Sequence, residues 1–303
     1  MKDYLNEVNE LFPIRRRDSE KADFYNYVRA QLGAERVNKE ILDKKHHNIV
    51  IGDISRAKVI FTAHYDTPYS SPVPNLMFPT SRVIGTIIHL IYPILLALLS
   101  LLVAYLISDA LGLDTLYFIL IYFVLFYGAF FGLNRTVTNK HNKNDNTSGV
   151  ATVLSIADAV TDGKAAFVLF DNEEKGLLGS KAFNKKHKSI LKDKLIVNFD
   201  CVGNGDQMMF IAKPMAEKTT EYGLLKSVIS TDDGFEVHHI PVNKALSNSD
   251  YKSFLYGVGV MASHRVPVVK FCTGRIHTAR DTVADSENVR FLTEGMIKFV
   301  EKI

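Results

Sequence analysis

Two long runs without a formal charge constrain the fold of this 303-residue chain more than any other feature. The first covers residues 83–107 and the second covers residues 116–133. As helices they would be about 37 and about 27 Å long, whereas the hydrocarbon core of a bilayer is about 30 Å thick. Because the linker between the two runs is short, the sequence predicts a transmembrane helical hairpin over residues 83–133.

Two alternatives stay open for this hairpin. It could be a lid or a dimer interface of a soluble protein, although roughly forty apolar residues would then need a cover. It could also be re-entrant, leaving the bilayer on the side where it enters, because Pro93 would kink the first helix.

Flanking charges predict the orientation of the hairpin. Asp109 and Asp114 lie in the turn between the two runs. The positively charged residues at the other end are Arg82, Arg135, Lys140 and Lys143. Since such residues remain on the cytoplasmic side, we expect a multi-pass cell-membrane protein with two helices and with the rest of the chain in the cytoplasm. The N-terminus has no apolar stretch typical of a cleaved signal peptide.

The remaining residues alternate between short β-branched runs and amphipathic segments. Strands are predicted at 48–52, 57–63, 165–170, 194–199 and 266–272, and helices at 149–160, 177–187, 215–231 and 287–303. Residues 3–34 show helical spacing in two pieces, broken at Pro13. This pattern predicts an α/β fold with a mixed, mostly parallel sheet between helices. Residues 1–82 and 134–303 would form one domain, and 83–133 would be inserted into it.

Composition excludes several functions. The net charge of +3 gives no indication of nucleic-acid binding, and Cys201 and Cys272 belong to no disulfide framework or zinc-finger spacing. Residues 15–17 are all arginine. They could contact anionic lipid headgroups, but a solvated turn between two helices is the favoured interpretation.

Five short stretches carry polar residues where open α/β sheets bind ligands, after apolar strands. They are AHYDT with His64 and Asp66, NDNTSGVATVL with Asp145, FDNEEKGLLGS with Glu173 and Glu174, NFDCVG with Asp200, and GRIHTARDT with His277. On a strand His64 and Asp66 would point the same way, as a metal-binding imidazole and the carboxylate that orients it. Taken alone, Asp145 would be read as a helix cap and His64 as a surface residue, and these are the commoner explanations.

Together these stretches supply two histidines, three carboxylates and one spare glutamate. Such a mixed nitrogen and oxygen set suits Zn²⁺, or another divalent metal such as Co²⁺ or Mn²⁺. Five ligands are too many for one open catalytic zinc, but they suit two ions about 3.5–4 Å apart that share a carboxylate.

The five motifs, in this order, resemble those of the co-catalytic di-zinc aminopeptidases, a family that also includes glutamate carboxypeptidase and glutaminyl cyclase. The resemblance covers residues from about 45 to 300, without the hairpin. It implies that Asp145 bridges two zinc ions, that Glu173 is the general base, and that the Asp145–Asn146 peptide bond is cis. It further implies one metal held by His64 and Asp200 and the other by Glu174 and His277.

The expected function is that of a membrane-anchored di-zinc aminopeptidase acting on peptides. A carboxypeptidase-, deacylase- or glutaminyl cyclase-like enzyme and an inactive membrane scaffold are the alternatives. Asp250, in SNSDYKSF, could bind a substrate ammonium group or cap a helix. Because the hairpin lies between His64 and Asp145, the site should open close to the bilayer, where short peptides or acylated molecules could reach it.

Overall fold

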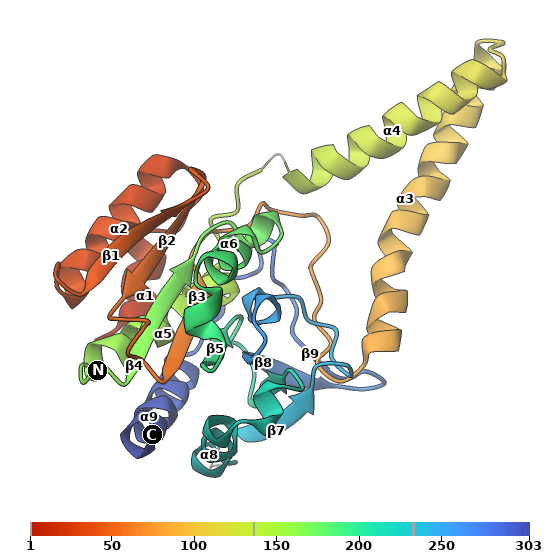
Figure 1. Cartoon of the computed structure of the whole chain (residues 1–303). Helices are drawn as coiled ribbons and strands as arrows, with labels where there is room; N and C mark the ends of the chain where they lie inside the picture. Colours follow the sequence, from red (N-terminus) through yellow and green to blue (C-terminus); the bar gives the residue numbers. More distant parts are fainter. Residues whose placement is uncertain (1, 136, 232–233) are drawn as a thin grey trace.

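A nine-stranded mixed sheet forms the centre of the protein (Figure 1). The computed structural model describes residues 2–135, 137–231 and 234–303. The strands are β1 (Val37–Leu42), β2 (His46–Ile51), β3 (Val59–His64), β4 (Ala165–Phe170), β5 (Leu195–Phe199), β6 (Gln207–Ala212), β7 (Glu236–Pro241), β8 (Gly257–Val266) and β9 (Lys270–Cys272). Their order is β1-β2-β4-β3-β5-β8-β6-β7, and β9 pairs with β8. The central strands β4, β3, β5 and β8 are parallel to one another, which confirms the predicted mixed α/β architecture.

Helices cover both faces of this sheet because its strands are apolar on both sides. On β3, Phe61 packs in the core beneath one layer of helices, whereas Ile60 packs beneath the other. The first layer consists of α1 (Tyr4–Leu11), α2 (Asp18–Leu32), α5 (Gly149–Ala159), α8 (Thr220–Val228) and α9 (Ser286–Lys302). The second layer contains α6 (Leu178–Lys186) and α7 (Lys188–Leu191).

The strand predicted at residues 266–272 is wrong in extent and direction. Residues 257–266 form β8, and the chain turns at Pro267 into the short antiparallel strand β9. β8 escaped prediction because glycine normally weakens a strand. Here Gly257 and Gly259 are required, since a Cβ atom on either would lie within 2.6 Å of Tyr251.

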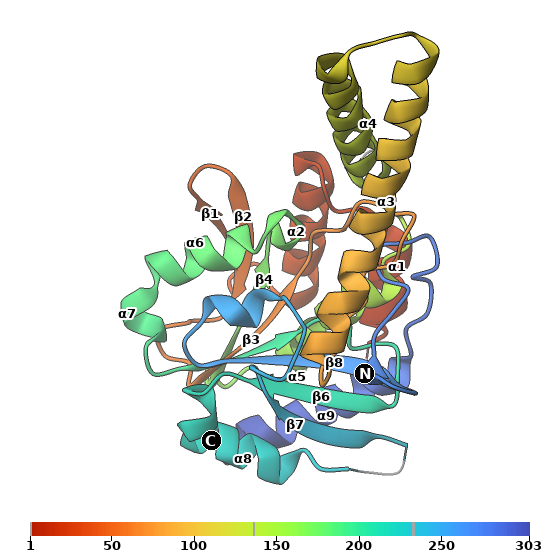
Figure 2. The ribbon, with the colours of Figure 1, turned by 90° about the vertical axis from the view of Figure 1, so that its right-hand side faces the viewer.

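Two long helices project from this α/β body (Figure 2). They are α3 (Arg82–Ala110) and α4 (Thr115–Arg135), and they pack against each other. By length and composition both could cross a membrane, and their most apolar windows are only 11% and 0% buried in the protein. The core helix of a soluble protein would be mostly buried, so these helices need another cover. The side chains of Asn134 and Arg135 lie outside the described part of the chain.

Candidate metal centre

The carboxyl ends of three parallel strands bring the predicted side chains to one edge of the sheet. His64 ends β3, Glu173 and Glu174 follow β4, and Asp200 follows β5. Asp145 lies in the turn before α5, and its peptide bond to Asn146 is cis, as expected from the resemblance. The loop after β9 adds His277. Five distant segments therefore meet at one place.

The distances within this group centre on the carboxylate of Asp145. Its Oδ1 lies 3.2 Å from Nε2 of His64, and its Oδ2 lies 3.1 Å from Nε2 of His277. Nε2 of His64 lies 3.7 Å from Oδ1 of Asp200, and Nε2 of His277 lies 3.3 Å from Oε2 of Glu174. Each oxygen of Asp145 thus faces a different imidazole, and each imidazole also lies near a second carboxylate, that of Asp200 for His64 and that of Glu174 for His277.

This arrangement fits a pair of metal ions. Two of the donor sets suited to a metal are His64 with Asp145 and Asp200, and Asp145 with Glu174 and His277. Zinc bonds of about 2.0–2.2 Å in tetrahedral geometry place ligand atoms about 3.3–3.5 Å apart, close to the observed separations. Oε1 of Glu174 is also buried without a hydrogen-bond partner among the described residues. A cation would satisfy this atom, since buried carboxylates normally have partners.

Asp66 has more contacts than the sequence predicted. Nδ1 of His64 donates a hydrogen bond to the main-chain carbonyl of Asp66 at 3.1 Å, whereas the Asp66 carboxylate is 3.6 Å away. This contact fixes the histidine tautomer and leaves Nε2 free for a metal. The Asp66 carboxylate itself accepts hydrogen bonds from the backbone N–H groups of Glu173 and Glu174, at 2.9 and 3.3 Å. Asp66 therefore positions the His64 imidazole through its main-chain carbonyl and the two glutamates through its carboxylate.

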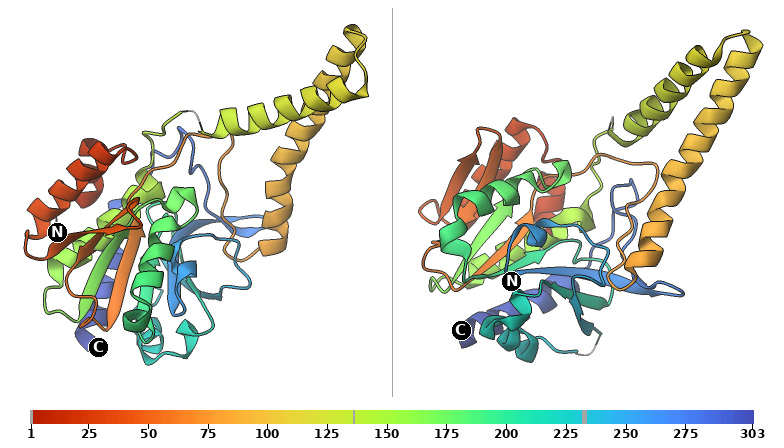
Figure 3. Two further views of the ribbon diagram at one scale, coloured as in Figure 1. Left: turned by 45° about the horizontal axis from the view of Figure 1, so that its top comes forward. Right: turned by 45° about the vertical axis from the view of Figure 1, so that its right-hand side comes forward.

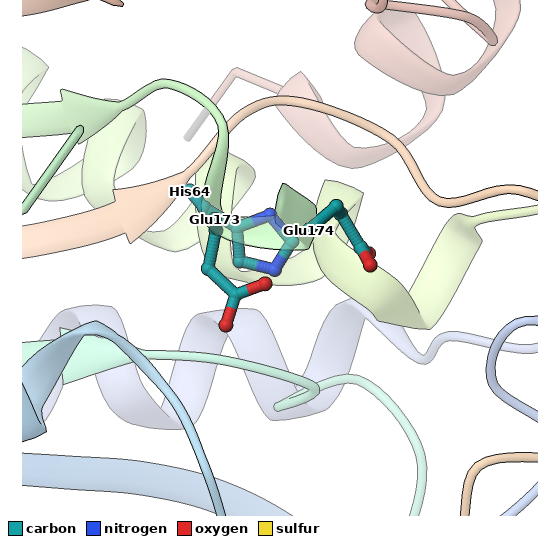
Figure 4. Close-up of side chains that lie close together, drawn as sticks. All are labelled: His64, Glu173 and Glu174. Atoms are coloured by element: carbon teal, nitrogen blue, oxygen red, sulfur yellow. The ribbon is translucent and has the colours of Figure 1, made fainter. Parts of the chain in front are cut away.

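The two adjacent glutamates point in different directions (Figure 4). The carboxylate of Glu174 faces His277, whereas that of Glu173 lies on the other side of the His64 imidazole. Glu173 does share a third donor set with His64 and Glu174. It belongs, however, to neither of the sets that contain Asp145, so it remains available for proton transfer.

Burial and mutual charge perturb the pKa values of Glu173, Glu174 and His277 in this centre. Desolvation raises the pKa of Glu173 well above its ordinary value, and the negative charges of Glu174 and Asp250 raise it further. Desolvation also raises the pKa of Glu174 to about 8. Burial disfavours a charged His277, but Glu174 and Asp145 outweigh this effect and raise its pKa to about 9. So many carboxylates in one buried place require compensating positive charge.

The sequence of the chain matches the profile of Peptidase family M28 over residues 136–299. The chain belongs to this family. It is therefore a zinc-dependent peptidase. The match begins after the hairpin, so His64 and Asp66 lie outside it and enter the centre through the fold. A comparison with curated protein sequences found no significant match.

Solved structures show the M28 fold over nearly the whole chain. The LapA aminopeptidase of Legionella pneumophila is 15% identical, with a TM-score of 0.57 over 99% of this chain and 69% of that one. Glutaminyl cyclase of Porphyromonas gingivalis is 13% identical, with a TM-score of 0.58 over 99% and 96%. Glutaminyl cyclase of Macrostomum lignano is 13% identical, with a TM-score of 0.53 over 100% and 87%. At such identities the likeness concerns the fold alone.

Two residues that support this M28 centre were not predicted. Asp281 accepts hydrogen bonds from the backbone N–H groups of Asn144 and Asp145, at 3.1 and 2.9 Å. Burial and the Asp145 charge raise the pKa of Asp281 to about 7. Asp281 lies in the motif IHTARDT, four residues after His277. This closeness to a predicted metal ligand could have indicated its role, because a carboxylate buried beside such a ligand needs hydrogen-bond partners.

Arg15 is the second, and it overturns the expectation of a solvated or lipid-bound turn. Its side chain is fully buried and donates to the carbonyls of Tyr65 and Phe12 and to the Thr147 hydroxyl. It thus links the N-terminal helices to the segments that follow His64 and Asp145.

Asp250 is also fully buried, and neither of its oxygens has a hydrogen-bond partner among the described residues. It lines neither of the cavities that reach the metal centre. Its role in substrate binding stays a prediction.

Proposed function

We propose that the chain is a membrane-anchored aminopeptidase that uses two metal ions. The observation that carries this proposal is the Asp145 carboxylate, whose two oxygens face two different imidazoles at 3.2 and 3.1 Å. His64 and Asp200 would hold one ion, Glu174 and His277 would hold the other, and the Asp145 carboxylate would be shared by both. When bound, zinc polarises a carbonyl group and makes a nearby water molecule more acidic.

Glu173 is the proposed general base. Its raised pKa suits a group that must accept a proton near neutral pH and then release it. Its carboxylate removes a proton from the water molecule that attacks the peptide carbonyl, and it returns that proton to the leaving amine. Asp66 holds Glu173 in place through the backbone N–H group.

The charges along the cavity favour an amino end over a carboxyl end at the metal centre. The inner cavity is lined by Glu173, Glu174, Asp145 and Asp200 and, among the described residues and besides its histidines, by one basic side chain, Lys252. The outer cavity is lined by Arg16 and Lys175. Because two bound divalent ions would offset the inner carboxylates, the bias comes from the outer end, where Arg16 and Lys175 would hold the peptide carboxylate away from the metal centre, as in an aminopeptidase.

A substrate panel with the full chain in detergent tests this function. Leucine amide and leucyl peptides with free amino groups should be hydrolysed, and chelator should abolish the reaction. Glu173→Gln should lower kcat by about 10² to 10⁴ while the zinc content is retained. Exposed Glu217→Gln is the matched control and should behave as wild type. Near wild-type turnover by Glu173→Gln, or ammonia release from N-terminal glutamine without peptide hydrolysis, would contradict the proposal.

Membrane anchoring is the second part of the proposal, with residues 83–133 as the hairpin and 1–82 and 134–303 as the cytoplasmic catalytic domain. The exposed apolar surface of α3 and α4 supports it. Leu111→Cys, in the exposed turn, should react with an impermeant maleimide in intact cells. Lys188→Cys, exposed on the catalytic domain, should react only after lysis. The reverse pattern would invert the orientation, and protection of both would exclude a spanning hairpin.

A further inference from the structure

Two connected cavities lead from the metal centre to the hairpin. The inner one has a volume of about 470 Å³ and includes His64, Asp145 and Glu173 in its wall. The outer one has a volume of about 1020 Å³. Six residues line both, so the two form one continuous space: Asn75, Leu76, His89, Glu174, Gly176 and His277.

Helix α3 forms one wall of this space along its first three turns. Thr86 and Leu90 face the inner cavity, Ile88 and Tyr92 face the outer cavity, and His89 faces both. Phe130 of α4 adds to the outer wall. The segment that leads into α3 also lines the outer cavity, with Val73, Pro74 and Leu76. The outer cavity is therefore mostly apolar along these segments, whereas Arg16 and Lys175 line another part of it.

This wall is fixed to the catalytic domain. A Cβ atom on Gly85 would lie 2.5 Å from Phe78 and 2.6 Å from Leu246, so α3 begins in close contact with buried Phe78 and half-buried Leu246. The hydroxyl of Ser81 donates to the carbonyl of Val269 at 2.6 Å. Figure 3 shows α3 rising beside the end of β8. The hairpin is thus part of the active-site wall as well as an anchor.

His89 places an imidazole within this mostly apolar wall. Its Nδ1 lies 2.9 Å from the carbonyl of Gly85, which can only accept, so the proton resides on Nδ1. The Phe78 ring holds the imidazole edge-on at 5.9 Å. Nε2 is then left as an acceptor for a backbone N–H group of a bound peptide.

We propose that the outer cavity binds the residues that follow the scissile bond and selects apolar ones. The substrates are then peptides with a free amino end and apolar second, third and fourth residues. Endoproteolytic cleavage of hydrophobic segments, including membrane-spanning ones, produces such peptides. The inference rests on the proposed aminopeptidase activity, because it assigns that activity a substrate class.

Pentapeptides with N-terminal leucine test the proposal on the full chain in lipid nanodiscs. One series carries leucine and valine at positions two to four, and the other carries serine and asparagine. Leucine amide measures hydrolysis at the metal centre without any residue in the outer cavity. N-lauroyl-leucine tests whether the outer cavity binds an acyl chain instead of a peptide. The kcat/KM for the apolar series should exceed that for the polar series at least about tenfold, as expected from burial of apolar side chains.

Two isoleucines one turn apart on α3 separate binding in the cavity from partition into the bilayer. Ile88 lines the outer cavity, whereas Ile91 is 50% exposed and lines neither cavity. Ile88→Ser should lower the ratio of apolar to polar kcat/KM at least about threefold, and Ile91→Ser should preserve it. Both variants replace one isoleucine of α3 by serine. The partition of peptides into the bilayer should therefore be the same for the two variants.

Equal kcat/KM for the two series, or equal ratios in the two variants, would overturn the proposal while leaving the aminopeptidase activity intact. Faster turnover of N-lauroyl-leucine than of either peptide series would also overturn it and would indicate an acyl substrate. Failure to hydrolyse leucine amide as well as both peptide series would instead remove the proposed function itself.

Discussion

Asp281 and Arg15 show how the metal centre is held in place by groups that touch no metal. The carboxylate of Asp281 accepts hydrogen bonds from two successive backbone N–H groups, those of Asn144 and Asp145. Arg15 binds the carbonyl of Tyr65, next to His64, and the hydroxyl of Thr147, next to Asn146. Each residue fixes the main chain beside a proposed ligand. We expect replacement of Asp281 to weaken metal binding and replacement of Arg15 to lower the free energy of unfolding.

Asp281→Asn should weaken metal binding. The amide keeps one oxygen that can accept a hydrogen bond, but its NH₂ group would face the second of the two backbone N–H groups that now donate to Asp281. Two donors that face each other form no hydrogen bond. Loss of partners that orient metal ligands typically costs about 10- to 100-fold in affinity. Zinc competition with a chelating dye measures this change, and exposed Asp193→Asn is the control. Unchanged zinc affinity in Asp281→Asn would show that Asp145 is held by other contacts.

Arg15→Met should lower the free energy of unfolding by at least about 2 kcal/mol, because it leaves buried carbonyl oxygens without a donor. Arg17→Met, at the exposed end of the same basic run, should stay within about 0.5 kcal/mol of wild type. Urea denaturation in mild detergent compares the two variants. Equal effects at both positions would contradict the structural role of Arg15.

The residues of the centre differ in how readily the sequence reveals them. His64, Asp200 and Glu174 were predictable because each comes at or just after the end of an apolar strand of a parallel sheet. Arg15 was not predictable, because its side-chain partners other than the Phe12 carbonyl lie fifty or more residues away. Nothing in the local pattern separates it from Arg17, which is exposed.

At the scale of elements, the start of α3 determines how the hairpin meets the catalytic domain. Gly85→Val would place a side chain against Phe78 and Leu246 and should displace the first turn of α3. The backbone bonds between Phe78 and Leu246, at 3.0 and 2.8 Å, should then open more often. Hydrogen exchange at these two amides should accelerate at least about tenfold.

Gly128→Val on α4 is the matched control for this experiment. Among the described residues, no atom beyond the adjacent backbone of α4 and the two chain neighbours lies within 4 Å of a Cβ atom at Gly128, and both glycines are helical. The control carries the same change in helix propensity without the clash. Equal exchange in the two variants would show that α3 is not packed against the domain.

Element prediction succeeded for the unbroken apolar run of β4, but it missed the similar run of β6 and failed where packing decides. β4 begins and ends where AAFVLF predicts, and α5 ends within one residue of its prediction. β8 was missed because Gly257 and Gly259 serve the approach of Tyr251, which no local pattern reveals. The hairpin was found from apolar length alone, whereas its place in the cavity wall depends on contacts with Phe78 and Leu246.

For the whole molecule, the metal centre makes folding depend on pH. In the metal-free protein the pKa of Glu174 rises from 4.5 to about 8, and that of His277 from 6.5 to about 9. Between about pH 4.5 and 9 the folded chain therefore binds more protons at these groups than the unfolded chain does. The free energy of unfolding of metal-free protein should then fall as pH rises through this window.

Zinc should reverse this trend, since metal ligands must lose their protons before they bind. The rise in melting temperature on adding zinc to chelator-treated protein should be small at pH 5.5 and larger at pH 8.5. Thermal denaturation in detergent at both pH values measures it. Glu174→Gln is the diagnostic variant, because it removes one raised pKa and one ligand together. It should flatten the pH dependence of the metal-free protein and weaken the response to zinc. A metal-free melting temperature that rises between pH 5.5 and 8.5 would show that the buried carboxylates of this centre are not the groups that govern its stability.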